Sequence, residues 1–188
     1  MGTQNKLLKP LDGRPLLAHA LARVDALGLA QTLVIAGDSA AAVRPLVPPS
    51  ATLLRNPHAN EGMGRSIACA APSIDAGLTG IFIVLGDMPF VKLSDYEKLA
   101  AALSLAGDAS ICVPVHDGRR GHPVLFGRRH FAELATLGGD MGARALLGRN
   151  SALVREVEGC SGGILIDLDD EHAFLTAEER LRQSSSGC

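Results

Sequence analysis

Apolar and polar positions follow two different periods along the chain. Residues 15–27 carry apolar side chains at helical spacing, and Gly28 ends that stripe. Residues 80–85 are instead almost continuously apolar, a pattern typical of a strand buried on both faces at the centre of a parallel sheet. The same reading predicts strands at 32–36, 51–55, 80–85, 110–115, 123–126, 152–157 and 163–166, and helices at 15–27, 40–46, 65–74, 94–105, 128–134, 141–147 and 171–183.

Local signals place the ends of several of these elements. Ser94 with Glu97 three residues later is typical of a capping box at a helix start. Asp117 and Gly118 lie between two apolar runs and indicate a hairpin with a longer loop. Asp140 precedes one predicted helix, and Asp169 or Asp170 is expected to cap the last one.

Strands alternating with helices predict an α/β fold with a mostly parallel sheet. We interpret residues 1–183 as one domain, because no linker or repeat interrupts the pattern, and residues 184–188 as a disordered tail. In such folds ligands bind beyond the carboxyl ends of the strands, so candidate chemistry is sought there.

Composition excludes several classes of function. Eighteen Lys and Arg residues against 20 Asp and Glu give a net charge of −2, and Trp is absent, so no nucleic-acid surface is indicated. No apolar run reaches the ~18 residues of a membrane span. The first ten residues lack the apolar stretch of a secretory signal, so a cytoplasmic location is expected. The four cysteines form no C-x-x-C pair, which argues against a zinc site or a disulfide framework.

Asp87 is the first candidate for chemistry. It follows the apolar run 80–85 and Gly86, which permits close approach to the backbone, while Pro89 stiffens the exit. A carboxylate at a strand end can hold Mg²⁺ together with phosphate oxygens, although it can also be a simple turn or capping residue. A second acidic cluster, residues 167–170, follows another apolar run and could share the metal.

The remaining candidates lie in polar or Gly-rich segments. Lys6 could contact phosphate or simply be solvated. The segment 61–64 could bind an anion or a nucleotide ring through free N–H groups, or only start a helix. His122 could bind substrate or be inert on its loop. The segment 138–144 resembles an anion-binding turn but lacks the spacing of a P-loop.

Six motifs in order resemble the MobA-like NTP transferases, most closely the branch of molybdenum cofactor cytidylyltransferases. The resemblance spans roughly residues 1–175. The matching stretches are Met1-Gly2 with Lys6-Leu7-Leu8 and Gly13-Arg14-Pro15-Leu16-Leu17; Asn56-Pro57 with Glu61-Gly62-Met63 and Ser66; Gly86-Asp87-Met88-Pro89; Gly121-His122-Pro123-Val124; Gly139 to Arg144; and Ile166-Asp167-Leu168-Asp169.

The resemblance implies a Rossmann-like three-layer nucleotidyltransferase that joins an NTP to a phosphorylated acceptor and releases pyrophosphate. CTP and a molybdopterin-type acceptor are expected. GTP, a sugar phosphate, or a catalytically impaired nucleotide-binding accessory protein are the alternatives. Transfer of the product to a molybdoenzyme or its chaperone is a further implication. A flavodoxin-like regulatory domain would also place acids at strand ends, but it leaves the Glu61 and His122 loops unexplained.

The resemblance also assigns roles to single residues. Lys6 contacts the triphosphate and, with Asp87, is catalytic; Asp87 and Asp169 hold Mg²⁺. The implied nucleotide contacts are Gly2, Lys6, Asn56, Glu61, Gly62, Met63, Ser66 and Gly86. The implied acceptor contacts are Met88, Pro89, His122, Asp140 and Arg144.

Two departures from the family pattern affect these expectations. Residues 169–173 read Asp-Asp-Glu-His-Ala where the family has Asp-Thr-Pro-Glu-Asp, so only the first acid of that element is kept. The family pattern also has an apolar strand and a Gly-rich loop ahead of the Met-Gly that matches Met1-Gly2. We therefore expect the N-terminal strand to be absent, through a misassigned start or a truncation. The chain as given should then bind NTP poorly and be less stable than an extended form.

Overall fold

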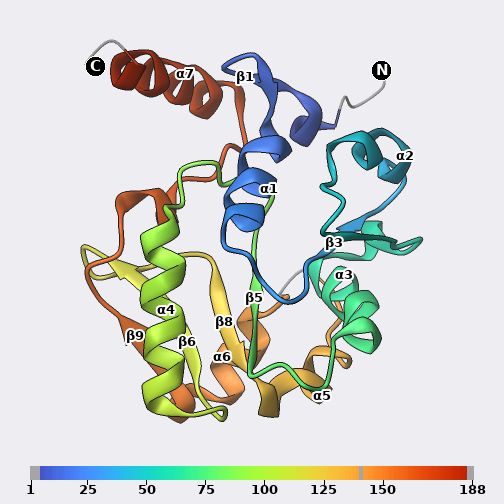
Figure 1. Ribbon diagram of the computed structural model, residues 1–188, viewed down its shortest axis with the longest axis vertical. Coiled ribbons are helices and arrows are strands. Elements are labelled where there is room, and N and C mark those ends of the chain that lie inside the picture. The colour runs from blue at the N-terminus through green and yellow to red at the C-terminus, as the bar shows by residue number, and fades with distance from the viewer. Residues whose placement is uncertain (1–4, 140–141, 186–188) are drawn as a thin grey trace.

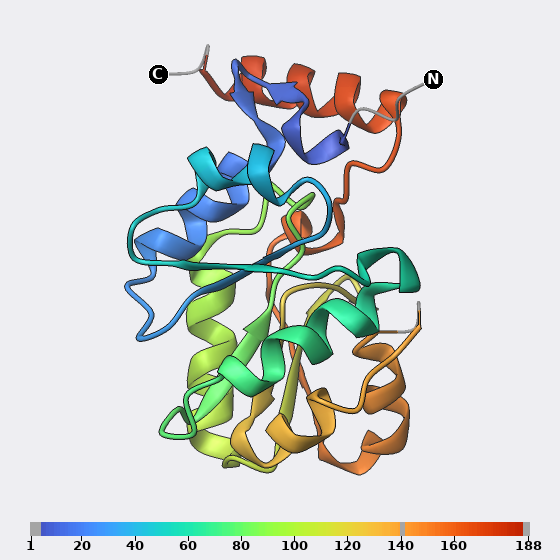
Figure 2. The same ribbon diagram turned by 90° about the vertical axis from the view of Figure 1, so that its right-hand side faces the viewer.

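The computed structural model describes residues 5–139 and 142–185 as three layers, with strands between two sets of helices (Figure 1). One helical layer contains α1 (Leu16–Ala26) and α4 (Leu93–Ala106), and the other contains α3 (Met63–Ala70), α5 (Phe131–Leu134) and α6 (Arg144–Arg149). Figure 2 shows the two layers on opposite sides of the strands. The predicted α/β class and three-layer arrangement are confirmed.

The larger sheet has the order β5 (Gly80–Ile83), β8 (Val124–Gly127), β6 (Ile111–His116) and β9 (Val154–Val157). β8 is antiparallel to both of its neighbours, so β5, β6 and β9 run in one direction. The hairpin turn at Asp117 and Gly118, both with positive φ, leads from β6 into the short β7 (Arg119–Arg120).

Two smaller strand pairs lie apart from this sheet. β3 (Leu33–Ala36) and β4 (Thr52–Arg55) pair in parallel, and the short α2 (Ala40–Val43) connects them. β1 (Pro10–Leu11) and β2 (Arg14–Pro15) form a hairpin that packs beside α7 (Glu171–Ser185). None of the described helices is long and apolar enough to cross a bilayer.

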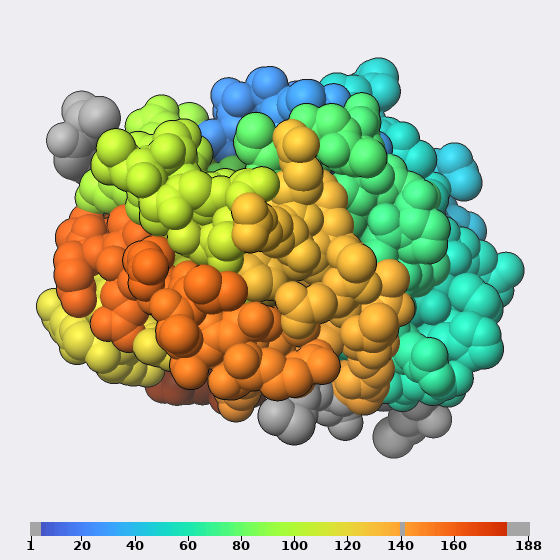
Figure 3. Space-filling view, turned by 90° about the horizontal axis from the view of Figure 1, so that it is seen from below, coloured from blue at the N-terminus to red at the C-terminus, as the bar shows by residue number. Residues whose placement is uncertain are grey.

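The core consists of separate clusters on the two faces of the sheet. Ile111 and Val113 of β6 pack toward Ile67 and Leu146 of the α3, α5 and α6 layer. Cys112, between them, packs toward α4. This alternation is what the period of two in a strand requires. Figure 3, seen from below, shows residues of the second half of the chain, lime to orange, over much of the end of the molecule away from α7, with green and teal residues of the first half beside them.

Three sequence predictions are corrected here. The run 80–85 forms a strand only to Ile83, pairs antiparallel with β8 along one edge, and is half-buried rather than central. Residues 163–165 lie in a 3₁₀ turn (Gly162–Leu165) instead of a strand, because Gly163 packs so tightly on the Phe90 carbonyl that a Cβ would lie 2.0 Å from it. Ser94 does not cap α4, since the helix begins one residue earlier.

Asp95 makes the capping contact of α4 instead. Its fully buried carboxylate accepts the Lys92 N–H at 2.9 Å. The same carboxylate accepts the Ser161 N–H at 2.8 Å and the Ser161 hydroxyl at 2.6 Å. The helix start is thereby joined to the loop that leads to the second acidic cluster.

Replacing Asp95 by Ala should lower the free energy of unfolding by about 3 kcal/mol, because three donors lose a charged acceptor in a buried site. Chemical denaturation monitored by circular dichroism measures the loss. Glu97→Ala, at an exposed position of the same helix, is the matched control and should change stability little. Equal midpoints for the two variants would contradict the assignment.

Candidate functional site

Two acidic loops meet at the end of the molecule near α7. Asp87 follows β5, and residues 167–169 follow the 3₁₀ turn that ends at Leu165. The Leu168 N–H donates to the Asp87 carbonyl at 3.1 Å, and the Leu168 side chain is fully buried. With Leu168 directed into the core, Asp167 and Asp169 on either side of it are exposed.

Lys6 lies between the two acidic loops. It begins a short 3₁₀ turn (Lys6–Leu8), which the Asn5 side chain caps by accepting the Leu7 N–H at 3.0 Å. Its Nζ donates to Asp87 Oδ2 at 2.7 Å and to Asp169 Oδ1. The structure therefore brings together three residues that the sequence resemblance singled out.

The charges of this cluster influence one another. Partial burial lowers the pKa of Lys6, but hydrogen bonds to Asp169 and Asp87 outweigh it and raise that pKa above 10.5. The hydrogen bond from Lys6 is the main reason that the pKa of Asp169 lies below 3.8. Both groups are therefore charged at neutral pH.

A divalent cation fits this arrangement. The Lys6 ammonium contacts one oxygen from each of two carboxylates, so both face a single point of positive charge. Among the described residues no three His, Cys, Asp or Glu side chains are grouped to hold a metal ion. A pair of carboxylates completed by phosphate oxygens is, however, the usual donor set for Mg²⁺.

Asp167 and Lys9 lie beside this cluster and were not singled out as site residues, although Asp167 belongs to the acidic cluster 167–170. Asp167 lies close enough to Asp169 to contribute to the lowered pKa of Asp169. Lys9 pairs with Glu171 at 2.6 Å and lies 4.4 Å from the Phe174 ring, which fixes the start of α7 beside Lys6. Asp167 could have been found from the sequence because it lies two residues from Asp169 on an extended segment, where alternate side chains share a side. A polar recess of about 140 Å³ opens between Lys6, Lys9 and Asp169.

Asn56 holds the loop between β4 and α3. It is only 2% exposed, accepts the His58 N–H at 2.9 Å and donates to Ser66 Oγ at 3.2 Å. Glu61 in this loop is engaged on the surface by His58 and Arg65. The hydrogen bond with His58 is the first cause of the lowered pKa of Glu61.

The Gly-rich segment before α6 packs against the start of α3. The Gly64 N–H donates to the Gly139 carbonyl at 2.9 Å, and Met63 packs on Gly142. Gly62, with φ of 104°, turns the chain into α3. The two segments predicted as separate binding loops are therefore neighbours. Gly2 and Asp140 lie outside the described residues.

His122 follows β7 and lies close to Asp87. Burial is the main cause of its lowered pKa, opposed by the charge of Asp87, while Arg144 lowers the pKa further. The ring bonds to the Ile83 backbone, and its buried Nδ1 has no partner among the described residues. His122 is thus a neutral ring at pH 7 with one nitrogen left to bind.

The other predicted contacts lie in different surroundings. Arg144 is exposed at the start of α6. Met88 and Pro89 are buried, and Met88 packs with Val91 and Tyr96 in a core cluster. Gly86 is approached by side chains, since a Cβ there would lie 2.9 Å from Leu17. Packing against the protein itself accounts for these three residues.

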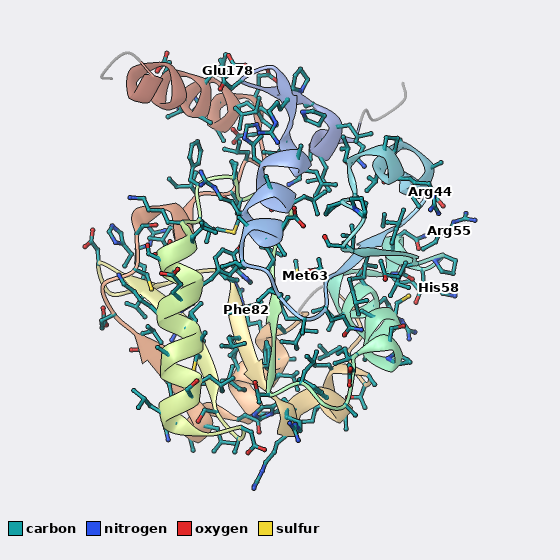
Figure 4. All side chains as sticks on the ribbon, in the orientation of Figure 1. Arg44, Arg55, His58, Met63, Phe82 and Glu178 are labelled. Carbon is teal, nitrogen blue, oxygen red and sulfur yellow. The ribbon has the colours of Figure 1, made fainter. Side chains whose placement is uncertain are left out.

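A large apolar cavity of about 860 Å³ lies beside the charged cluster and does not coincide with it. We call it the apolar slot. Residues 32–37 and 79–86, which contain β3 and β5, border it, and α1 and α3 line it. Figure 4 shows Phe82, one of its lining residues, in the middle of the molecule, whereas Arg44, Arg55 and His58 lie at the outer edge. Met63, another lining residue, is 42% exposed.

Removing the Lys6 charge should raise the pKa of Asp169 back toward 3.8, because the hydrogen bond that lowers it is lost. The Lys6–Asp169 contact stabilises the fold above the ordinary Asp pKa and is lost as the pH falls below it. On the alkaline side it is lost only as Lys6 deprotonates above 10.5. Carboxyl NMR titration of Lys6→Gln tests this, with Lys9→Gln as control. An unchanged Asp169 pKa would refute the contact.

The two charges near His122 should shift its pKa in opposite directions. Asp87→Asn should lower the pKa of His122, and Arg144→Gln should raise it, because a nearby anion favours the imidazolium and a nearby cation disfavours it. Imidazole NMR titration measures both. Shifts of the same sign in the two variants would show that His122 does not lie between these charges.

Comparisons with known proteins identify the family of this chain. The family profile described as the MobA-like NTP transferase domain matches residues 1–154. The bifunctional protein GlmU of Thiobacillus denitrificans is 34% identical over 125 residues, which are 65% of this chain. The chain spans about a quarter of the length of the curated relatives it matches, 26% for this one.

Solved structures share the fold over nearly the whole chain. The crystal structure of Rv0371c from Mycobacterium tuberculosis H37Rv has a TM-score of 0.79 at 27% identity, covering 94% of this chain and 89% of that one. Its complex with manganese has a TM-score of 0.76 at 26% identity, covering 94% and 92%. The molybdopterin-guanine dinucleotide biosynthesis protein A of Archaeoglobus fulgidus, at 19% identity, has a TM-score of 0.66, covering 95% and 91%. Because the family profile matches most of the chain, this chain belongs to the MobA-like NTP transferase family of nucleotidyltransferases.

Proposed function

We propose that the chain transfers a nucleotidyl group from an NTP, with CTP favoured, to a phosphorylated acceptor of the molybdopterin type and releases pyrophosphate. The observation that carries the proposal is the Lys6 ammonium held between Asp87 and Asp169. Two carboxylates that converge on one cation at the end of an α/β domain suit a metal-bound triphosphate. The preference for CTP and molybdopterin rests on the sequence resemblance alone.

The proposed reaction needs positioning and charge neutralisation rather than a protein nucleophile. An acceptor phosphate oxygen attacks the α-phosphorus of the NTP, and the bond from that phosphorus to the bridging oxygen breaks as pyrophosphate leaves. Asp87 and Asp169 would hold Mg²⁺, which neutralises charge on the phosphates when bound. Lys6, released from the carboxylates, would bind the triphosphate as a mobile positive charge.

Other residues would bind the two substrates. The loop between β4 and α3, which the hydrogen bond from Asn56 to Ser66 holds in place, would bind the base and ribose of the NTP. Gly62 and Met63 at the start of α3 would take part in this contact. The unpartnered Nδ1 of His122 and the exposed Arg144 support contacts with the acceptor. Gly2 and Asp140 keep their predicted roles. A cytoplasmic location and delivery to a molybdoenzyme or its chaperone also belong to this proposal.

One observation favours a weaker activity within the same proposal. The apolar slot leaves about 860 Å³ unfilled beside β3 and β5. The residues proposed to bind phosphate are therefore supported by fewer packing contacts. A nucleotide-binding protein with little or no turnover is the second candidate on that ground. GTP or a sugar phosphate are the alternative substrates.

Pyrophosphate release with each of the four NTPs, Mg²⁺ and molybdopterin as acceptor tests the proposal. Asp87→Asn should reduce release by about a hundredfold or more, because one of the two metal ligands loses its charge. Asp38→Asn, at a carboxylate 98% exposed on the surface, should have no effect. Retained turnover in Asp87→Asn would refute the metal role. NTP binding without turnover in the unaltered chain would favour the accessory protein.

A further inference from the structure

The start of α3 and the Gly-rich segment before α6 touch through their main chains. The Gly64 N–H donates to the Gly139 carbonyl at 2.9 Å. A Cβ at Gly64 would lie 2.7 Å from the carbonyl carbon and oxygen of Gly138 and 2.8 Å from its nitrogen. Main-chain atoms cannot rotate away from such a clash as the end of a side chain can, so this close approach requires glycine at position 64.

The helix itself does not favour glycine at this position. Gly64 is the second residue of α3, and alanine is preferred to glycine within a helix. Gly64 is buried in the contact, whereas Gly138 is exposed. A Cβ at Gly138 would have no described heavy atom within 4 Å. The contact therefore needs a glycine on the α3 side but not at position 138.

The same end of α3 packs against the residues that lead into α6. Met63 lies against Gly142, where a Cβ would lie 3.2 Å from the Met63 sulfur. Ile67, four residues after Met63 and so on the same face of the helix, shares a core cluster with Ala143. Ala143 is 5% exposed and directly precedes Arg144. The backbone that carries Arg144 is therefore held against the start of α3.

In the proposed reaction these two segments bind different substrates. The loop that leads into α3 would bind the NTP and Arg144 would bind the acceptor, so this inference rests on the proposed function. The reaction forms a bond between the two substrates, and misplacing one of them by about 1 Å can slow such a step by about a hundredfold. The separation of the two segments must therefore be fixed for the acceptor oxygen to reach the α-phosphorus.

We propose that Gly64 is a positioning residue that sets the distance between the bound nucleotide and the bound acceptor. It acts through the backbone before Arg144, which it holds against the start of α3, and it is assigned no contact with either substrate. A side chain at position 64 would push the two segments apart and leave each of them able to bind its own substrate.

The first test separates turnover from nucleotide binding. Gly64→Ala should lower kcat for pyrophosphate release from CTP and molybdopterin by about a hundredfold, while the Kd for CTP with Mg²⁺ changes by less than about threefold. Gly148→Ala, at an exposed glycine of α6 with open space around its Cβ, is the control and should change neither value. A merely structural role would weaken CTP binding and turnover together. Such a parallel loss, or equal kcat values in the two variants, would overturn the proposal.

The second test is amide hydrogen exchange of the purified chain without any substrate. In Gly64→Ala the amides of residues 64 and 143–147 should exchange about tenfold faster or more, because the contact that holds the two segments together is lost. Gly138→Ala adds the same methyl group on the open side of the contact and should exchange as the unaltered chain does. Equal exchange at 143–147 in these two variants would show that position 64 does not join the segments and would refute the proposal.

A third variant applies if Gly64→Ala does not fold. Ala143→Val adds two methyl groups where Ala143 packs in the cluster with Ile67, so it should move α6 away from α3 and lower kcat with the CTP Kd retained. Unchanged turnover in folded Ala143→Val would overturn the proposal. Absence of turnover in the unaltered chain would instead refute the proposed function, and the exchange comparison then decides by itself whether position 64 joins the two segments.

Discussion

The hydrogen bond from the Leu168 N–H to the Asp87 carbonyl joins the two acidic loops on which the site depends. Two carboxylates at adjacent loop ends repel each other unless a cation lies between them, and Lys6 supplies that cation in the protein alone. Burial of Leu168 orients the neighbouring acids outward. The charged cluster is therefore a consequence of backbone pairing and core packing, with the lysine as its counter-ion.

Much of this arrangement could be predicted from local sequence. The stripe at 15–27 predicted α1 to within a residue, because helical periodicity is a local property. Asp170 was expected to cap the final helix, and its carboxylate accepts the Ala173 N–H at 2.8 Å. Asp87 could be placed at a strand end because an apolar run and a glycine precede it. The helix that Asp170 caps, α7, extends through Ser185, two residues into the predicted tail.

The features that escaped prediction depend on contacts distant in sequence. An apolar run such as 80–85 shows that a strand is buried but not which partner it pairs with, so the antiparallel pairing with β8 could not be derived. Residues 163–166 have the composition of a strand, yet the Phe90 carbonyl and the Asp95–Ser161 contact hold them in a turn. The β1–β2 hairpin, with positive φ at Asp12 and Gly13, lies just before the helix at 15–27, where no element was predicted.

The apolar slot and the charged cluster share one point of contact, the turn that contains Lys6 and Leu7. Leu7 covers Gly86 and the end of the slot, while Lys6 extends from the adjacent position to Asp87 and Asp169. Any displacement of Leu7 moves the backbone from which Lys6 extends. In the proposed reaction Lys6 must leave its two carboxylate partners to bind phosphate. The packing of Leu7 therefore influences how readily Lys6 exchanges partners. The packing around the slot therefore bears on phosphate binding through the backbone of this turn, besides the two lining residues, Met63 and Ser66, that lie in the proposed nucleotide loop.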